Sequence, residues 1–509
     1  MSTGPPTDLT QKIHCVLFLA LDVQLERQRG DAVHTRELAA EFGNLGLKVC
    51  LVTSTPESMV PRMGANVIHR TCPNVGVMRL TIWLSKLASQ IAADIIYERR
   101  FSPKVGLGTK ALCGTPLVVE INGLVDEERV VQGRPPLASA GLRKWWHGTL
   151  FHFADGIVAV TNGIRDVLVN EYGVSPLHIE VVPNGANVTV FRPKDRRICR
   201  EALGLSDAPL VSFVGELAPW QGVDSLVRAA ILLKTRVTDV AVMVVGDGMN
   251  RSSIRSLVED TGAPVHLVGR IAHKEIPTYL GAADVVVIPK LPLRSGYSPL
   301  KLYEALASGR AVVASREPGL EFIEKEEVGV LVPSNNPEAL ADALAQILMN
   351  PNRRLAIESR ARTLAETSFS WNQTARRVLR AMEKFHAVQV VSPPPISIGA
   401  RSHTNRAGST CHHYRAPCPG VPRSPPIDCL TDTNSCSFAI LLTSSPRFVT
   451  SEVQAVRIHD GIRPSGGSTH SHVCTSRTQK SPTLDPIASR VFSIPVIFKN
   501  PTPMGPPGA

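Results

Sequence analysis

The sequence has no transmembrane span, no paired cysteines and few aromatic residues, and these absences exclude several classes of protein. The apolar run Cys15–Leu21 is about a third of the ~20 residues that a membrane-spanning helix needs. It lacks a basic segment before it and a small-residue cleavage site after it, so it does not predict a signal peptide. The ten cysteines are scattered singly, which indicates reduced thiols rather than a disulfide framework. We therefore expect a cytoplasmic protein.

The chain has fewer acidic than basic residues, and this imbalance is uneven along the chain. The sequence has 55 Lys+Arg against 44 Asp+Glu, a net charge of +11 and a pI near 9.3, values that by themselves favour a nucleic-acid or anionic membrane partner. Residues 387–509 hold 11 Lys+Arg and 5 Asp+Glu, so this segment carries about half of the excess. Because the rest of the chain offers no basic helix with interleaved aromatics, we expect no nucleic-acid partner.

Residues 387–509 differ in composition from the rest of the chain. They contain 17 of the 40 prolines, many Ser and Thr, and no sustained period of 3.6 or 2. Such a composition cannot bury enough apolar surface to offset the entropy of ordering, so we expect a disordered tail. The spacing of Cys411, His412, His413 and Cys418 fits none of the usual structural zinc sites, and no metal is expected.

The other three quarters of the chain alternate short β-branched runs with amphipathic stretches of ten or more residues. Strands that are nearly continuous in Val, Ile and Ala are typical of parallel sheets covered on both faces. The second half predicts strands at Leu210–Gly215, Val240–Gly246, Val265–Gly269, Asp284–Pro289, Ala311–Ser315 and Val328–Val332. The first half predicts strands at Ile13–Ala20, Val49–Thr53, Ile95–Tyr97, Leu117–Ile121 and Ile157–Val160, with a helix at Ala32–Gly43. Two doubly wound α/β domains follow from this pattern.

The predicted organisation has five segments. A flexible N-terminus (1–12) precedes a Rossmann-like domain (13–195), a second Rossmann-like domain (196–368), a C-terminal helix that returns to the first domain (369–386), and the tail (387–509). Two common nucleotide motifs are missing: no GxxxxGK[ST] exists and no GxGxxG follows the first strand. A kinase-type NTPase and an ordinary dehydrogenase are therefore disfavoured.

The segment 298–309 carries the most specific chemistry of the second domain. Ser298 is a good helix N-cap and Pro299 suits a first turn. Lys301 then lies at a helix N-terminus, where a cation is unfavourable unless an anion neutralises it, and Glu304 follows on the same side. A cation for a diphosphate beside a carboxylate for ribose hydroxyls is typical of a sugar-nucleotide site. An ordinary Lys–Glu pair on a capped surface helix is the alternative.

Several motifs in order over residues 13–386 resemble the retaining glycosyltransferases of family 4, which have the GT-B fold and are also called glycosyl transferases group 1. In chain order they are Gly30–Ala39, Ile96–Phe101, Val118–Asn122, Val182–Gly185, Phe213–Gly222, Val245–Gly248, Val265–Arg270, and Ser298–Gly309 followed by Ala311–Ser315. The S-P-L-K-x-x-E stretch is similar to a subset of that family. The resemblance implies two Rossmann-like domains that face across a cleft, a nucleotide diphospho-sugar donor, and no metal or other cofactor.

The resemblance also implies roles for individual residues. Lys301 and Gln221 would act on the leaving diphosphate, Asn122 would orient the donor sugar, and Glu304 would hold the ribose. The residues that it assigns to nucleotide-sugar binding are Gly30, Gly215, Trp220, Gly222, Gly269, Arg270, Ser298, Pro299, Leu300 and Glu304.

The sequence departs from the family pattern at four positions. Gly296 stands where the first carboxylate of an E-x7-E motif belongs, and Asn122 stands where a donor-side His is usual. Glu216 and Gln221 occupy places that hold an Arg and a Lys in many relatives. Lys301 is interpreted as the replacement cation, because a developing diphosphate needs charge-assisted contacts.

The sequence thus predicts transfer of a sugar to an acceptor hydroxyl with retention of anomeric configuration. Two alternatives stay open: an inactive GT-B protein that binds a nucleotide or a partner, and another GT-B activity such as a nucleotide-sugar epimerase or a phosphorylase. Carbohydrate, lipid-linked and small-molecule acceptors all remain candidates, and the oligomeric state is not predicted. Peripheral membrane contact by the first domain is a further candidate, although no clear basic amphipathic helix supports it.

Overall fold

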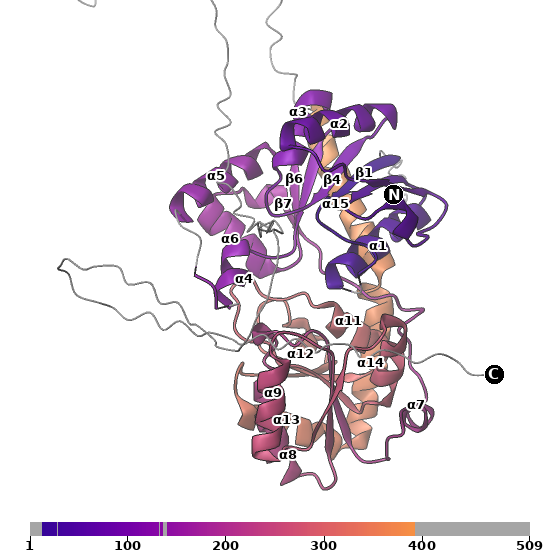
Figure 1. Cartoon of the computed structure of the whole chain (residues 1–509), viewed down its shortest axis with the longest axis vertical. Helices are drawn as coiled ribbons and strands as arrows, with labels where there is room; N and C mark the ends of the chain where they lie inside the picture. Colours follow the sequence, from indigo (N-terminus) through magenta and orange to yellow (C-terminus); the bar gives the residue numbers. More distant parts are fainter. Residues whose placement is uncertain (1–12, 28, 132, 136–139, 392–509) are drawn as a thin grey trace, which may run out of the picture. The chain divides into compact units, whose positions relative to one another are not determined.

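The computed structural model describes residues 13–27, 29–131, 133–135 and 140–391, and it contains two parallel sheets of seven and six strands (Figure 1). The predicted fold class, with two doubly wound sheets flanked by helices, is confirmed. The predicted N-terminal segment 1–12, the Cys411–Cys418 cluster and residues 392–509 of the predicted tail lie outside the described residues.

The first sheet has the strand order β3-β2-β1-β4-β5-β6-β7. Its strands are β1 (Cys15–Ala20), β2 (Lys48–Thr53), β3 (Val67–Thr71), β4 (Ile95–Arg99), β5 (Leu117–Ile121), β6 (Gly156–Ala159) and β7 (Ile179–Val181). The helices in this part are α1 (Gly30–Asn44), α2 (Val77–Gln90), α3 (Lys104–Cys113), α4 (Val125–Val131), α5 (Ala140–Phe153) and α6 (Asn162–Tyr172), with short 3-10 turns at Glu57–Met59 (η1) and Pro176–His178 (η2).

The second sheet has the order β10-β9-β8-β11-β12-β13. Its strands are β8 (Leu210–Val214), β9 (Ala241–Val245), β10 (Val265–Gly269), β11 (Val285–Ile288), β12 (Ala311–Ser315) and β13 (Gly329–Val332). Its helices are α7 (Arg196–Leu203), α8 (Val223–Lys234), α9 (Arg251–Thr261), α10 (Ile276–Ala282), α11 (Leu300–Ala307), α12 (Phe322–Lys325), α13 (Pro337–Leu348) and α14 (Pro351–Ser368), with 3-10 turns at Pro219–Gln221 (η3) and His273–Glu275 (η4).

The last helix, α15 (Trp371–Val391), joins the core of the first sheet although it follows the second in the sequence. Its residues Val378, Met382 and Phe385 pack in one buried cluster with Phe18 and Tyr97 of the first sheet. The helix continues past residue 386, where the sequence predicts the tail to begin.

Two strands were not predicted from the sequence. Edge strand β3 has a half-exposed pattern in which His69 and Thr71 alternate with more exposed residues, so it lacks the continuous apolar run of a buried strand. Edge strand β7 has three residues and gives little signal of either period. The central strands, which are covered on both faces, were the ones that composition could identify.

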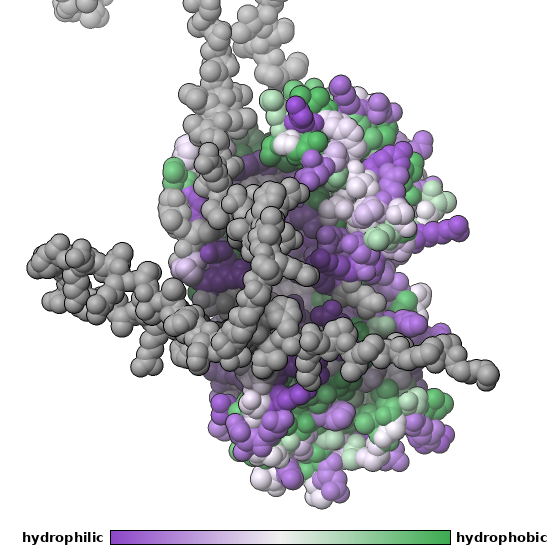
Figure 2. All heavy atoms as spheres, in the orientation of Figure 1, coloured by the Kyte–Doolittle hydropathy of each residue, from purple (hydrophilic) through white to green (hydrophobic). Residues whose placement is uncertain are grey.

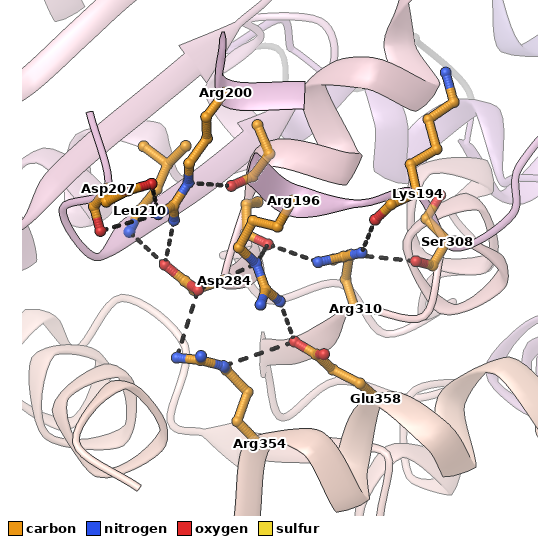
Figure 3. Close-up of polar contacts among 12 residues, drawn as sticks. Lys194, Arg196, Arg200, Asp207, Leu210, Asp284, Ser308, Arg310, Arg354 and Glu358 are labelled. Atoms are coloured by element: carbon orange, nitrogen blue, oxygen red, sulfur yellow. Dashed lines mark hydrogen bonds and ion pairs between the residues drawn. The ribbon is translucent and has the colours of Figure 1, made fainter. Parts of the chain in front are cut away.

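A buried ionic network fixes the amino end of β11, at the opposite end of the strand from the carboxyl ends where ligands bind in such sheets (Figure 3). Asp284, directly before β11, accepts from Arg200 Nη2 at 2.7 Å and lies 3.2 Å from Arg196 Nε. Arg196 Nη2 also donates to Glu358 at 2.6 Å, and Arg354 lies 3.5 Å from Asp284. The network therefore ties α7 and α14 to the sheet, and we assign it a structural role.

Candidate functional site

The turn after β8 contains two glycines, Gly215 and Gly222, at which other structural elements approach the backbone closely. Gly222 has φ +63°, and an added Cβ would lie 1.8 Å from the carbonyl oxygen of Pro289, directly after β11. Gly215 has φ +149°, and an added Cβ would lie 2.3 Å from Nζ of Lys301. These close approaches bring the ends of β8 and β11 and the start of α11 together.

Lys301 lies in the first turn of α11 with its ammonium group against the end of β8. Its Nζ donates to Oε1 of Gln221 at 2.8 Å and lies 4.0 Å from the centre of the Phe213 ring. Burial lowers the pKa of Lys301 well below its usual value and Lys290 adds to the effect, while Glu304 and Glu216 oppose it. The sequence-predicted cation and its predicted neighbour Gln221 are thus in contact.

Lys290 is a second lysine at this edge of the sheet, and it was not predicted from the sequence. It follows β11, is only 4% exposed, and its Nζ lies 4.5 Å from the centre of the Tyr297 ring. Burial lowers the pKa of Lys290 to about 7, against the opposing charge of Glu216. Lys290 could have been predicted from its position at the carboxyl end of a central strand, where ligands bind in such sheets. Neither Lys290 nor Lys301 has an ion pair within the described part of the chain, so no close carboxylate offsets the cost of holding these amino groups in their charged form.

Glu304 lies one turn after Lys301 on α11 and is 7% exposed. Its Oε1 lies 3.3 Å from Nε2 of His273, in the turn after β10, and the His273 ring packs edge-on against Phe191 at 5.6 Å. The contact with His273 was also missed, because it joins residues 31 positions apart. The carboxylate therefore stands at the meeting point of α11 and the β10 loop.

The predicted capping of this helix is wrong. The helix begins at Leu300, so Pro299 occupies the N-cap position and not the first turn. The Ser298 hydroxyl accepts instead from the backbone N–H of Asn184 at 2.9 Å and lies 2.9 Å from the Tyr303 hydroxyl. The Asn184 side chain donates to the Ser298 carbonyl at 2.7 Å. The Ser298 hydroxyl is thus hydrogen-bonded to Asn184, which precedes the second sheet in the sequence, and it does not cap α11.

The structure explains why a carboxylate is missing at Gly296. This residue has φ +68°, and a Cβ added there would lie 2.1 Å from the carbonyl oxygen of Pro318. A glutamate at this position would need a different backbone path. The preceding residues, Arg294 and Ser295, donate their backbone N–H groups to Glu127 of α4 at 2.7 and 3.1 Å.

Four other predicted binding residues are Gly30, Trp220, Gly269 and Arg270. Gly30, at the start of α1, lies near Leu300, since an added Cβ would be 3.7 Å from Leu300 Cδ1. Trp220 packs against the core of the second sheet, and its carbonyl accepts from Leu291 at 3.2 Å. Gly269 ends β10 with φ +90°, and Arg270 after it is exposed.

Asn122 belongs to a polar cluster at the carboxyl ends of β4 and β5 in the first sheet. Its Nδ2 donates to Glu120, which also accepts from the Tyr97 hydroxyl at 2.5 Å and lies 3.0 Å from His34 Nε2 and 3.4 Å from Arg99 Nε. Burial by itself raises the pKa of Glu120, but the charges and hydrogen bonds around it outweigh burial and lower the pKa to about 2. Glu120 is therefore an ionised anchor that fixes the Asn122 amide.

Glu98 differs from Glu120 in that its pKa is raised. It is 1% exposed, and its Oε2 accepts from the Gly106 N–H at 3.1 Å. Burial raises the pKa of Glu98 to about 8, although Arg100 and the Gly106 hydrogen bond oppose the shift. A carboxyl group with this raised pKa is mostly protonated near pH 7, and Glu98 is hydrogen-bonded to the backbone of α3, so we assign it a structural role.

The chain is similar to known sugar-transfer proteins in both halves. Residues 29–190 match the family described as Glycosyltransferase Family 4, and residues 208–350 match Glycosyl transferases group 1. The D-inositol 3-phosphate glycosyltransferase of Mycobacterium avium is 30% identical over 302 residues, which cover 57% of this chain and 69% of that protein. The protein of the same name from a Nocardioides species is 29% identical over 316 residues, covering 58% and 68%.

The fold is likewise similar to that of solved structures. Anabaena HepE in complex with UDP matches 73% of this chain and 100% of its own, with a TM-score of 0.60 and 18% sequence identity. At this identity the likeness concerns the fold alone, and it agrees with the predicted GT-B architecture.

Proposed function

Because the chain belongs to the group 1 glycosyl transferases of family 4, we propose that it transfers a sugar from a nucleotide diphospho-sugar to an acceptor hydroxyl with retention of anomeric configuration. The observation that carries the donor part of this proposal is the pair of Lys290, which is buried, and Lys301, which is half-buried, both without ion-pair partners in the described part of the chain. A buried cation is unfavourable until an anion neutralises it, and a diphosphate carries the charge to do so.

The diphosphate would lie against Lys301 and Lys290, with the Gln221 amide as a neutral contact. The backbone N–H groups at the start of α11, which begins at Leu300 without a side-chain cap, would add to the positive field. Glu304, one turn on, would accept the two vicinal hydroxyls of the ribose. Gly30, which lies near Leu300, would let α1 of the first domain approach the same phosphates.

Bond cleavage at the anomeric carbon leaves positive charge on the sugar and negative charge on the departing diphosphate. Lys301 and Lys290 would stabilise the leaving group as its charge grows, and this difference between ground state and transition state lowers the barrier. Asn122, held by the ionised Glu120, would orient the donor sugar. Retention would follow from attack of the acceptor hydroxyl on the same face of the sugar, with the leaving phosphate taking its proton.

The test is release of nucleoside diphosphate from UDP-, GDP- and ADP-sugars, with and without acceptor. D-inositol 3-phosphate is the first acceptor to try, because the two relatives above are named for it. An α-linked product from an α-linked donor, identified by the NMR coupling of its anomeric proton, is the expected result. A β-linked product would overturn retention, and no release from any donor would overturn the transferase proposal in favour of a binding role.

A further inference from the structure

Three helices on one side of the first sheet contain no acidic residue. Helices α2, α3 and α5 together hold six Lys and Arg, namely Arg79, Lys86, Lys104, Lys110, Arg143 and Lys144, and neither Asp nor Glu. Elsewhere the chain mixes both signs, as in α1 with Asp31, Glu37 and Glu41. These three helices are therefore a basic part of this side of the molecule, whereas the adjacent α6 carries Asp166 and Glu171.

The three helices lie next to one another. Nζ of Lys110 in α3 donates to the carbonyl oxygen of Phe153 in α5 at 3.0 Å, and Nζ of Lys104 lies 6.0 Å from the centre of the Trp146 ring. Helices α2 and α3 share a groove of about 270 Å³ whose lining includes Lys86 and Leu112. Their inner faces bury residues such as Leu84, Val105 and Phe151 against the sheet. The outer faces therefore form one continuous layer, the α2–α3–α5 surface.

This surface exposes large apolar side chains. The exposed members are Val77, Met78, Ile82, Leu112, Leu142, Trp145, Trp146 and Phe153, with Met78 at 71%, Leu142 at 66% and Trp145 at 65% exposure. On α5, four of them recur at helical spacing along one stripe, opposite the buried Gly148 and Phe151. Green residues gather over α2 and α3 in Figure 2. Such a concentration of exposed apolar groups marks an interaction surface.

Three of the six basic residues on this surface are in ion pairs, and the other three have none within the described ranges. Lys110, Arg143 and Lys144 are paired with Asp155, Asp126 and Glu171 from neighbouring elements. Arg79, Lys86 and Lys104 are exposed and have no ion-pair partner within the described ranges. Three cations without ion-pair partners thus lie on the helical layer that exposes Trp, Met and Leu side chains.

We propose that the α2–α3–α5 surface docks on the interface of an anionic lipid bilayer. Tryptophan is favoured at the boundary between headgroups and acyl chains, and each Lys or Arg near an anionic leaflet adds to the attraction. No helix within the described residues is long and apolar enough to cross a membrane, so the contact is peripheral. A single helix did not reveal the surface in the sequence, because its charge and its apolar residues are divided among three helices.

Charge complementarity favours an anionic bilayer over two other candidate partners of this surface, a second copy of the chain and residues 387–509. A second copy of the chain would place like charges against each other. Residues 387–509, with 11 Lys+Arg and 5 Asp+Glu, carry the same sign as the surface. The proposal stands independently of the sugar-transfer proposal, since it uses none of the predicted catalytic residues.

The experiment is co-sedimentation of the full-length protein with vesicles of phosphatidylcholine alone or of an equal mixture with phosphatidylglycerol. We expect binding to the anionic vesicles, weakened by added salt, and little binding to the neutral ones. The triple variant Arg79→Ser, Lys86→Ser, Lys104→Ser should bind the anionic vesicles roughly tenfold or more weakly. The double variant Trp145→Gln, Trp146→Gln should lose binding as well, because it removes the apolar part of the contact.

A matched control removes three exposed cations from the second sheet's helices, Lys234→Ser, Lys325→Ser and Arg353→Ser. It lowers net charge equally and should bind like the wild type. Circular dichroism checks that every variant is folded. If the control and the triple variant lose vesicle binding equally, net charge alone accounts for the binding, and the proposed docking surface is overturned. Absence of vesicle binding by the wild type, or light scattering that shows a dimer dissociated by Trp145→Gln, Trp146→Gln, would also overturn the proposal.

Discussion

Replacing Lys290 by methionine should make the protein more stable and, at the same time, worse at binding a nucleoside diphosphate. The pKa of Lys290 falls from 10.5 to about 7 on folding, because the ammonium group is buried. Near pH 7 the unfolded chain therefore binds a proton that the folded chain holds only in part, and this linkage opposes folding by on the order of 4 kcal/mol. Loss of the contact with the Tyr297 ring offsets some of the gain. We expect Lys290→Met to raise the free energy of unfolding by about 2–3 kcal/mol.

The pH dependence identifies the cause. A lysine whose pKa is lowered by folding destabilises the folded state fully at and below the folded pKa, and the effect disappears as the pH rises toward the unfolded value. The stability difference between Lys290→Met and the wild type should thus be largest near pH 7 and shrink toward pH 10. Urea denaturation at several pH values measures it. Binding of UDP or GDP by the wild type at pH 8 should take up protons, which calorimetry in buffers of different ionisation enthalpy detects.

The same variant should lose roughly tenfold or more in affinity for UDP or GDP, since a hydrogen bond to a charged group contributes about 1.5–3 kcal/mol. Lys325→Met, which removes an exposed lysine on α12, is the matched control and should change neither quantity. A less stable Lys290→Met protein with unchanged affinity would refute the reasoning, because it would make Lys290 an ordinary structural residue.

Three further predictions concern single carboxylates. Glu304→Gln should weaken nucleoside diphosphate binding by roughly tenfold, measured by calorimetry, while apo stability changes little. Asp284→Asn should lower the free energy of unfolding by about 3–5 kcal/mol in urea denaturation, because it leaves the buried Arg200 without its close carboxylate partner, yet keep the nucleotide affinity. For Glu120, whose pKa falls to about 2 on folding, the stabilising charge is present above pH 4.5 and lost as the pH falls toward 2, so the stability difference from Glu120→Gln should shrink over that window.

The fold was predictable because its central strands are covered on both faces. Such strands must be apolar at every position, and runs such as Val285–Ile288 can be read directly from composition. The edge strand β3 could not be read in this way, since its alternating exposure is shared by loops.

The candidate site was predictable where its residues share one local element. Lys301 and Glu304 were placed together because they lie one turn apart on α11. The predicted role of Ser298 as a helix cap was wrong, because its hydroxyl accepts a hydrogen bond from the backbone of Asn184, 114 positions away. Local capping preference cannot predict a contact between residues so far apart in the sequence. Lys290 and His273 were missed for a related reason: the burial of one and the carboxylate contact of the other exist only after strands distant in sequence have packed side by side.

If the Lys301 end of α11 meets a diphosphate, calorimetric titration with paired nucleotides will detect the contact. UDP and UMP, and likewise GDP and GMP, differ by one phosphate group, so their affinity ratio reports the contact of the cations with the second phosphate. For the wild type we predict at least roughly tenfold tighter binding of the diphosphate of the preferred base. Lys301→Met should reduce this ratio toward one and leave the monophosphate affinity nearly unchanged. Equal affinity of the wild type for diphosphate and monophosphate, or an unchanged ratio in Lys301→Met, would contradict the account.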